Sequence, residues 1–331
     1  MRYTVIKRAF TILFSLATLL LFLGPEQSVA GQPIRITEAK EALICPAFSS
    51  GGLLIAATQV NWRGIWLMAT DGTGLRRLTD DPGAGYRFAW SPDGAQIAYR
   101  TEKRIDGKRY FAIRIVDAEN GRVEELTDFR RYLGTPRWVL GDGTVAFEID
   151  REGTLAQALV VGLIADQPKE AAPHRVATTS RDLRIWISEA DGTNRRPISG
   201  PGERCFDPVI SPRGDRICYT VLDSGGRIEV VAIDGSWQAD LGYGSNPSWS
   251  PDGRYLAYEV TEDDGHVITG SDLHIASSDG SRRIQLTDTP ERFERWPSWS
   301  PDGSHIVYSA GGAIFLIPVP SSLDAPTEEA P

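Results

Sequence analysis

The sequence predicts an all-β protein, a six-bladed β-propeller made of four-stranded antiparallel sheets. A thirteen-residue motif occurs six times, and a second motif follows most of its copies. Helical periodicity is absent outside the N-terminal leader. Small sheets repeated about every 40 to 50 residues cannot bury both faces alone, so they stack radially around a common axis.

The first motif is clearest in PSWSPDGRYLAYE (Pro247–Glu259) and PSWSPDGSHIVYS (Pro297–Ser309). Four more copies lie at Pro46–Thr58, Phe88–Arg100, Pro136–Glu148 and Pro208–Thr220. Their bulky anchor residues are Phe48, Trp90, Trp138, Ile210, Trp249 and Trp299. Ser-Pro-Asp-Gly suits a type I turn, so each copy predicts a β-hairpin. We therefore interpret Asp93, Asp252 and Asp302 as turn residues and not as catalytic groups.

The second motif is an apolar strand, an Asp-Gly turn and another strand. It is clearest at Ile65–Asp80, Ile185–Ser199 and Leu273–Asp288, and weaker at Ile113–Asp128 and Ile228–Gly242. Each repeat thus contributes two hairpins, or four antiparallel strands.

The ends of the repeat array predict how the ring closes. The last copy has only three plausible strands, and Ile34–Ile36 could supply the fourth. This closure avoids a long unpaired edge. Trp138 and Ile210 are 72 residues apart, which indicates an insertion at about 152–180 in the third blade. A seventh, degenerate blade is the alternative.

Residues 1–30 have the pattern of a signal peptide. Basic residues precede the apolar run Ala9–Gly24, and Ser28-Val29-Ala30 offers a cleavage site. An uncleaved anchor is the alternative. We expect export to the periplasm or the extracellular space, no stable membrane span after cleavage, and a disordered tail at 321–331. The remaining three cysteines are odd in number, and Cys205 and Cys218 are out of register, so we expect no disulfide.

Together the two motifs resemble the repeat of the TolB-type six-bladed propellers, a WD-like repeat family of bacteria. The resemblance covers about residues 34–320. TolB itself carries an additional domain ahead of its propeller, and no such domain is expected here. The resemblance therefore implies the propeller fold and does not carry over the TolB partners.

The sequence offers no catalytic constellation. It lacks Gly-x-Ser-x-Gly, and its four histidines and three cysteines have no metal-ligand spacing. The acidic run Glu262–Gly265 fits a solvated loop better than a calcium loop. The net charge of -9 argues against nucleic-acid binding. We predict no metal and no cofactor.

Connections between blades should end over the central channel, and arginines and aromatic residues gather there. The candidate binding residues are Tyr86, Arg87, Phe129, Arg131, Tyr132, Arg204, Tyr243, Arg292, Arg295 and Trp296. Arginines bind carboxylates through two hydrogen bonds, which predicts an acidic peptide or anionic glycan ligand. Alternatively, the aromatic residues only pack between blades, and the arginines neutralise Asp80, Asp81, Asp128 and Asp288.

We therefore expect an exported, monomeric, non-enzymatic propeller that binds a protein or an anionic ligand at the cell envelope. Two alternatives remain: a small propeller enzyme of the lyase or lactonase type, and a non-catalytic subunit of a larger envelope complex.

Overall fold

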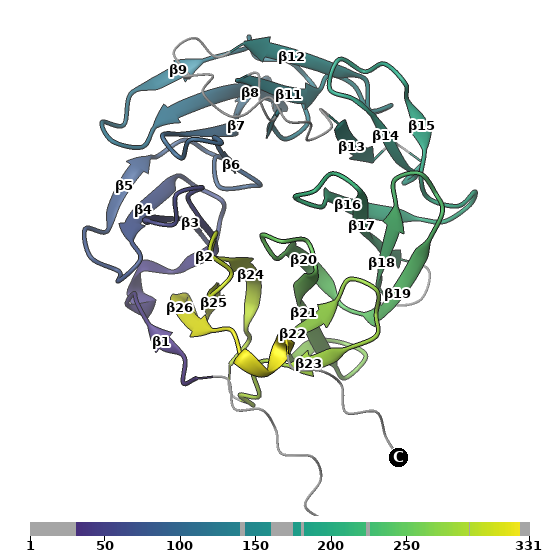
Figure 1. Ribbon diagram of the computed structural model, residues 1–331. Helices are drawn as coiled ribbons and strands as arrows, with labels where there is room; N and C mark the ends of the chain where they lie inside the picture. The colour runs from purple at the N-terminus through teal and green to yellow at the C-terminus, as the bar shows by residue number, and fades with distance from the viewer. Residues whose placement is uncertain are drawn as a thin grey trace, which may run out of the picture. The chain divides into compact units, whose positions relative to one another are not determined.

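The computed structural model describes residues 31–139, 143–159, 175–179, 182–222, 226–290 and 292–324. Up to Val319, its strands form seven small antiparallel sheets around one centre (Figure 1). The all-β propeller prediction is confirmed, with the seven-bladed alternative giving the correct count. Ser321–Asp324 forms a short 3₁₀ helix in a separate unit. The predicted signal peptide (1–30) and residues 325–331 of the tail lie outside the described residues.

Four sheets are meanders of four consecutive strands. The first contains β2 (Leu43–Phe48), β3 (Leu54–Gln59), β4 (Ile65–Ala69) and β5 (Arg76–Thr79). The second contains β6 (Ala89–Trp90), β7 (Gln96–Ile105), β8 (Lys108–Asp117) and β9 (Val123–Glu125). The fifth contains β16 (Cys205–Ile210), β17 (Arg216–Val221), β18 (Arg227–Ala232) and β19 (Gln238–Tyr243). The sixth contains β20 (Ser245–Trp249), β21 (Tyr255–Asp263), β22 (Ile268–Ser277) and β23 (Arg283–Gln285).

Two sheets have three strands each among the described residues. The third contains β10 (Arg137–Trp138), β11 (Thr144–Glu148) and β12 (Leu155–Leu159). The fourth contains β13 (Arg175–Thr179), β14 (Ile185–Glu189) and β15 (Arg196–Pro197). The range 152–180, expected to be an insertion, thus includes strands of two different sheets. Residues 160–174 and 180 within it lie outside the described part of the chain.

The seventh sheet joins the two ends of the ring. It contains β24 (Arg295–Trp299), β25 (His305–Ala310), β26 (Ala313–Pro318) and β1 (Ile34–Arg35). Ile34 lies opposite Leu316, and Arg35 lies opposite Phe315. The Ile314 amide also donates a hydrogen bond to Thr37 Oγ1 at 2.8 Å. A 3₁₀ helix, η1 (Ala39–Glu41), then leads to β2. The predicted closure by an N-terminal strand is confirmed.

The repeated turns have the geometry that their residues predict. Ser300 Oγ donates to Asp302 and accepts a hydrogen bond from the His305 amide. Hydrogen bonds from Ser300 and Ser304 lower the pKa of Asp302 to about 2. The equivalent Asp93 and Asp252 also accept bonds within their own turns. These aspartates therefore stabilise turns, as expected.

Anchor tryptophans connect neighbouring sheets. Each indole N–H donates to a backbone carbonyl oxygen of the preceding described anchor strand, at 2.9–3.2 Å. The pairs are Trp90 with Ala47, Trp138 with Ala89, Trp249 with Val209, and Trp299 with Ser248. A buried indole N–H needs such a partner, so each anchor both packs and fixes the register between sheets.

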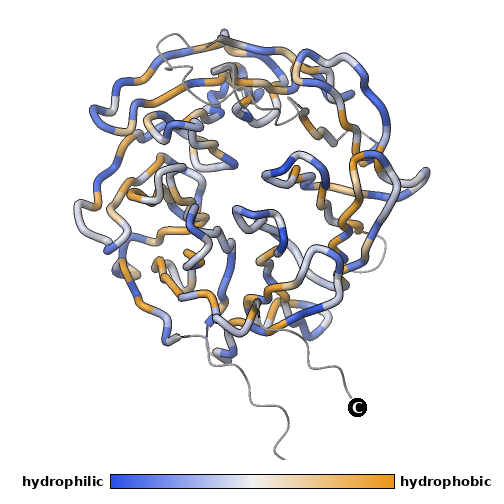
Figure 2. The backbone as a smooth tube through the Cα atoms, viewed as in Figure 1, coloured by the Kyte–Doolittle hydropathy of each residue, from blue (hydrophilic) through white to orange (hydrophobic). Residues whose placement is uncertain are grey.

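The second strand of each motif hairpin contributes large buried side chains to the core. Seven residues after the anchors stand Ile55, Ile97, Val145, Ile217, Leu256 and Ile306, all fully buried. Two residues further on, four copies place a buried tyrosine: Tyr99, Tyr219, Tyr258 and Tyr308. Figure 2 shows hydrophobic stretches along the strands and hydrophilic stretches in many of the connecting loops. Cys45, Cys205 and Cys218 are free thiols.

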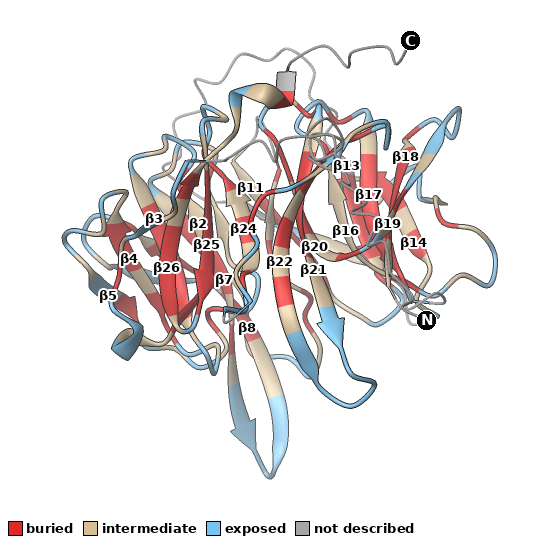
Figure 3. Ribbon diagram, turned by 90° about the horizontal axis from the view of Figure 1, so that it is seen from below, coloured by how far each residue is buried: buried red, intermediate tan, exposed pale blue. Residues whose placement is uncertain are grey.

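The ring has two different faces. One, here called the turn face, carries the Ser-Pro-Asp-Gly and Asp-Gly turns. The other, the mouth face, carries the hairpins between second and third strands and the connections between sheets. Two long hairpins project on the mouth face (Figure 3). No helix among the described residues has the length and apolar character needed to cross a membrane.

Candidate functional site at the channel mouth

Six residues surround the channel, each immediately before a copy of the first motif and three positions before its anchor. We call these the ring residues: Cys45, Arg87, Thr135, Asp207, Asn246 and Trp296. All except Thr135 have left-handed backbone conformations, with φ between 51° and 57°. This region is uncommon for non-glycine residues, costs about 1–3 kcal/mol at each site, and clusters at functional sites.

Local bulges place the ring residues. The ladder shifts register in β2, β16, β20 and β24, at the point where the ring residue and the following proline stand. Proline has no N–H to offer the ladder, which favours a bulge there. A bulge redirects one side chain, and here the redirected side chains line the channel.

The channel mouth contains a cavity of about 460 Å³. The ring residues Cys45, Arg87, Asp207, Asn246 and Trp296 line it, together with Trp62, Tyr86 and Arg295. A second cavity of about 720 Å³ shares Arg87 and Phe88 with the first and is lined by the anchor strands, including Thr135. The two cavities follow the centre of the ring.

Two ion pairs balance the charge at the mouth. The Arg87 guanidinium contacts the Asp207 carboxylate, which joins the second and fifth sheets across the channel. Arg295 donates to Glu259 Oε1 at 3.2 Å. Asp80 instead pairs with Arg63 and Arg77, and Asp81 pairs with Arg114. Arg87 and Arg295 therefore have carboxylate partners, but different ones from those proposed on sequence grounds.

Glu259 organises one side of the mouth from a fully buried position. Its carboxylate accepts hydrogen bonds from Ser245 Oγ, the Asn246 amide group, the Arg295 guanidinium and the Trp296 backbone N–H. These donors fix two ring residues, Asn246 and Trp296. Buried carboxylates are stable only when paired and hydrogen-bonded in this way.

Aromatic rings form one wall of the cavity. Trp62 lies edge-on to Tyr86, with ring centroids 5.4 Å apart, and to Trp296, at 6.1 Å. Arg295 stacks over Trp296 at 4.6 Å. Burial raises the pKa of the Cys45 thiol. Cys45 is therefore a neutral part of the wall and not a thiolate nucleophile.

The structure brings together four of the ten residues predicted for the site: Tyr86, Arg87, Arg295 and Trp296. The other six are on or near the mouth face but do not line this cavity. Phe129 and Arg131 contact the β7–β8 hairpin through Lys103 and Tyr110.

The remaining four have separate surroundings. Tyr132 is partly buried, and this burial raises its pKa. Arg204 is exposed on the loop before β16, and the Tyr243 hydroxyl contacts the Thr261 hydroxyl. Arg292 stacks over Phe315 at 5.1 Å.

Sequence reasoning missed Cys45, Asp207, Asn246, Trp62 and Glu259. A usable signal existed for three of them, because Cys45, Asp207 and Asn246 occupy the same motif position as Arg87 and Trp296. Five ring residues also precede a proline: Cys45, Thr135, Asp207, Asn246 and Trp296.

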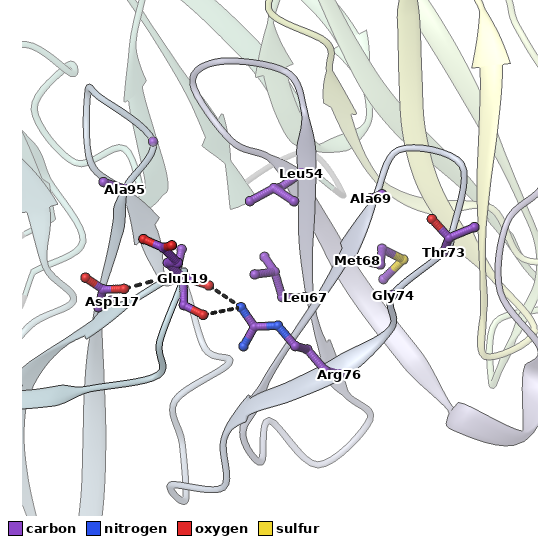
Figure 4. Close-up of a pocket in the computed structure, with 12 residues that line it drawn as sticks. Leu54, Leu67, Met68, Ala69, Thr73, Gly74, Arg76, Ala95, Asp117 and Glu119 are labelled. Atoms are coloured by element: carbon purple, nitrogen blue, oxygen red, sulfur yellow. Dashed lines mark hydrogen bonds between the residues drawn. The ribbon is translucent and has the colours of Figure 1, made fainter.

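A separate cavity of about 520 Å³ lies on the turn face between the first and second sheets (Figure 4). Arg76 spans it and donates to the Ala118 carbonyl oxygen and, at 3.0 Å, to that of Glu119. Arg196, at the equivalent position of another repeat, donates to Ile233 in the neighbouring sheet. We interpret this cavity as part of the seam between sheets.

Among the residues that the structure describes, no three His, Cys, Asp or Glu side chains are grouped to hold a metal ion. A ligand carboxylate can pair with Arg87 only by competing with Asp207, and with Arg295 only by competing with Glu259.

Comparisons with known proteins agree with the fold. No family model matches the chain. TolB from Acinetobacter baumannii superimposes with a TM-score of 0.56 and 19% identity, over 82% of this chain and 60% of TolB. A putative TolB from Agrobacterium tumefaciens gives a TM-score of 0.52 and 17% identity, over 84% and 91% of the two chains.

A dipeptidyl-peptidase 5 from Porphyromonas endodontalis is 25% identical over 235 residues. That match covers 70% of this chain but only 31% of the peptidase. The chain therefore spans less than a third of the length of this relative. Its motifs, its ring of sheets and its structural neighbours agree on one conclusion: in its fold, the chain is a TolB-like β-propeller.

Proposed function

We propose that the protein is an exported, non-enzymatic binding module whose mouth face docks a protein partner. The exposed apolar side chains carry this proposal. Twelve large apolar residues are exposed in the described part of the chain, and eight of them lie on the mouth face. These eight are Val60, Tyr86, Ile105, Leu222, Tyr243, Val267, Ile268 and Phe293. Exposed apolar side chains on one face, with polar neighbours, are typical of protein interfaces.

The channel mouth supplies the specific part of this surface. Arg87 and Asp207 are both accessible, with side chains 38% and 25% exposed. A partner carboxylate can bind Arg87 only if the partner also gives Asp207 a donor, because an unpaired charge is costly. We therefore expect a protein segment with an acidic side chain beside a hydrogen-bond donor, and with an apolar group for the Trp62–Tyr86 wall.

Export is supported by the residues of the leader, Arg2, Lys7 and Arg8 before Ala9–Gly24. N-terminal sequencing of protein recovered from the producing bacterium tests it. A mature N-terminus at Gly31 is the expected result, and an intact Met1 in the cytoplasmic fraction would contradict it.

Binding is tested with purified protein immobilised on a column and challenged with envelope extract. Trp296→Ala and Arg87→Gln should each lower retention of the same protein at least tenfold, since both side chains line the mouth. Arg213→Gln, a change of the same charge on the turn face, is the control and should leave retention intact. Equal retention by all variants, with unchanged circular dichroism, would refute binding at the mouth.

A further inference from the structure

Two hairpins on the mouth face are longer than the others. β7 and β8 pair through ten residue pairs, and β21 and β22 through nine. The other second-to-third hairpins have four to six pairs. About four additional pairs extend a hairpin by roughly 13 Å. Both long hairpins project from the same side of the ring (Figure 3).

The β7–β8 hairpin forms a basic arm, although the protein as a whole is acidic. With the adjoining strand segment it exposes six cations: Lys103, Arg104, Lys108, Arg109, Arg130 and Arg131. In the described part of the chain, only Arg109 has a carboxylate partner, Glu102 at 3.7 Å. Arg104 lies directly opposite Arg109 in the ladder. Like charges in this position destabilise a hairpin, so an external anion would stabilise the arm.

The basic arm is also preorganised. Lys103 lies over the Phe129 ring at 3.7 Å, and Arg131 lies over the Tyr110 ring at 5.3 Å. These contacts hold the cations in place without neutralising them. The turn at the tip uses Asp106 and Gly107, both with positive φ, as a tight two-residue hairpin turn requires.

The β21–β22 hairpin forms an acidic arm. Glu262, Asp263 and Asp264 are exposed on it, and the exposed Asp288 adjoins it. None of the four has a lysine or arginine partner among the residues with described positions. Asp264 accepts hydrogen bonds from the backbone of Val267 and His266, which lower its pKa. These bonds favour the charged form of the Asp264 carboxylate.

The two arms lie across the channel from each other. They belong to the second and sixth sheets, with the seventh and first sheets between them on one side. Exposed apolar residues occur at both tips, Ile105 on the basic arm and Val267 and Ile268 on the acidic arm. The mouth face is thus positive on one side, negative on the other, and apolar in part.

We propose that this face pairs with the same face of a second copy of the chain. A two-fold axis in the plane of the face, midway between the arms, places each basic arm against the acidic arm of the other copy. A two-fold interface must be self-complementary, and this charge layout meets that condition. The dimer goes beyond the partner binding proposed above, and it competes with it because it covers the channel mouth.

Charge reversal tests the dimer. The basic-arm variant carries Arg104→Glu and Lys108→Glu, and the acidic-arm variant carries Glu262→Lys and Asp288→Lys. Within the described ranges, these four side chains make no hydrogen bond or ion pair that either variant would remove. Arg122→Glu with Arg213→Glu reverses two exposed charges in turns of the opposite face and serves as the matched control.

Sedimentation equilibrium of the purified protein at low and high salt gives the dissociation constant. The wild type and the control should dimerise at micromolar concentration, and each arm variant should bind itself at least tenfold more weakly. An equimolar mixture of the two arm variants should form a heterodimer, and a variant with all four substitutions should dimerise again. High salt should weaken every dimer because its arms are exposed.

Other outcomes would overturn the proposal. A wild type that stays monomeric at about 1 mM, well above the range of specific complexes, excludes the dimer. A dimer that neither arm variant weakens places the interface elsewhere. Either result leaves partner binding at the mouth intact, because the column experiment tests Arg87 and Trp296, which the arm variants leave unchanged.

Discussion

The side-chain amide of Asn246 donates a hydrogen bond to Glu259, 2.7 Å away, and the Glu259 carboxylate is fully buried. The geometry of the channel mouth thus depends on a carboxylate that no ligand can reach. This arrangement is rigid because Glu259 also accepts bonds from Ser245, Arg295 and Trp296.

Replacing Glu259 by alanine should destabilise the protein by about 3–5 kcal/mol, because Arg295 and three other donors lose their acceptor. Glu259→Gln keeps one acceptor oxygen and should therefore destabilise the protein less than Glu259→Ala does. Urea unfolding followed by tryptophan fluorescence measures both. Glu262→Ala, on the same strand but exposed, is the control and should change stability by less than about 0.5 kcal/mol.

The tryptophan bonds between sheets make a second prediction. Trp138→Phe keeps an aromatic ring but removes the donor to the Ala89 carbonyl oxygen, so it should cost about 1–2 kcal/mol. Trp237, exposed on the turn face, provides the comparison. Denaturant titrations measure the free energy of unfolding of both variants. If Trp237→Phe lowers it as much as Trp138→Phe does, the hydrogen bond between sheets does not contribute measurably to stability.

Ring closure can be tested with one hydroxyl group. Thr37→Val removes the Oγ1 acceptor of the buried Ile314 amide and should cost about 1–3 kcal/mol. Thr37→Ser keeps the oxygen and should stay close to wild type. Thermal unfolding distinguishes the two variants, and a loss in Thr37→Ser without a loss in Thr37→Val would point to the methyl group instead of the hydrogen bond.

The raised pKa of Glu294 predicts that the stability of the protein depends on pH. Burial, and then the nearby Asp272 carboxylate, raise the pKa of Glu294 to about 7, while Arg292 opposes this shift. The neutral Tyr308 also lies close to it. The folded chain therefore holds this proton to a higher pH than the unfolded chain does. The resulting stability is fully present below about pH 4.5 and is lost as the pH rises through 7.

Glu294→Gln should remove this dependence. Relative to the variant, the wild type should lose on the order of 3 kcal/mol between about pH 4.5 and pH 8. Urea unfolding at several pH values measures the difference. Parallel curves for the two proteins would show that Glu294 has an ordinary pKa.

The hairpins, the anchors and the closing strand could be predicted from the sequence because local rules determine them. Turn residues specify each hairpin, and the residues seven after the anchors are buried in every copy. The number of sheets could not be predicted with the same certainty. The fourth sheet has a recognisable second motif at Ile185–Ser199 but no anchor motif before it.

The site was only partly predictable for a different reason. Arg87 and Asp207 are 120 positions apart in the chain, and only the closed ring brings them into contact. Glu259 looks like an ordinary polar end of a strand, although it occupies the same motif position as the buried Glu148. Bulges decide which side chains enter the channel, and the sequence shows them only as a proline after the ring residue.

The pairing of β1 with β26 has a consequence for biosynthesis. Residues near position 34 leave the ribosome about 280 residues before their strand partners near position 315. The β1 strand therefore stays unpaired in the nascent chain until β26 has been synthesised. A chaperone that shields this segment, or folding of the ring that is delayed until β26 is available, would meet the same physical need.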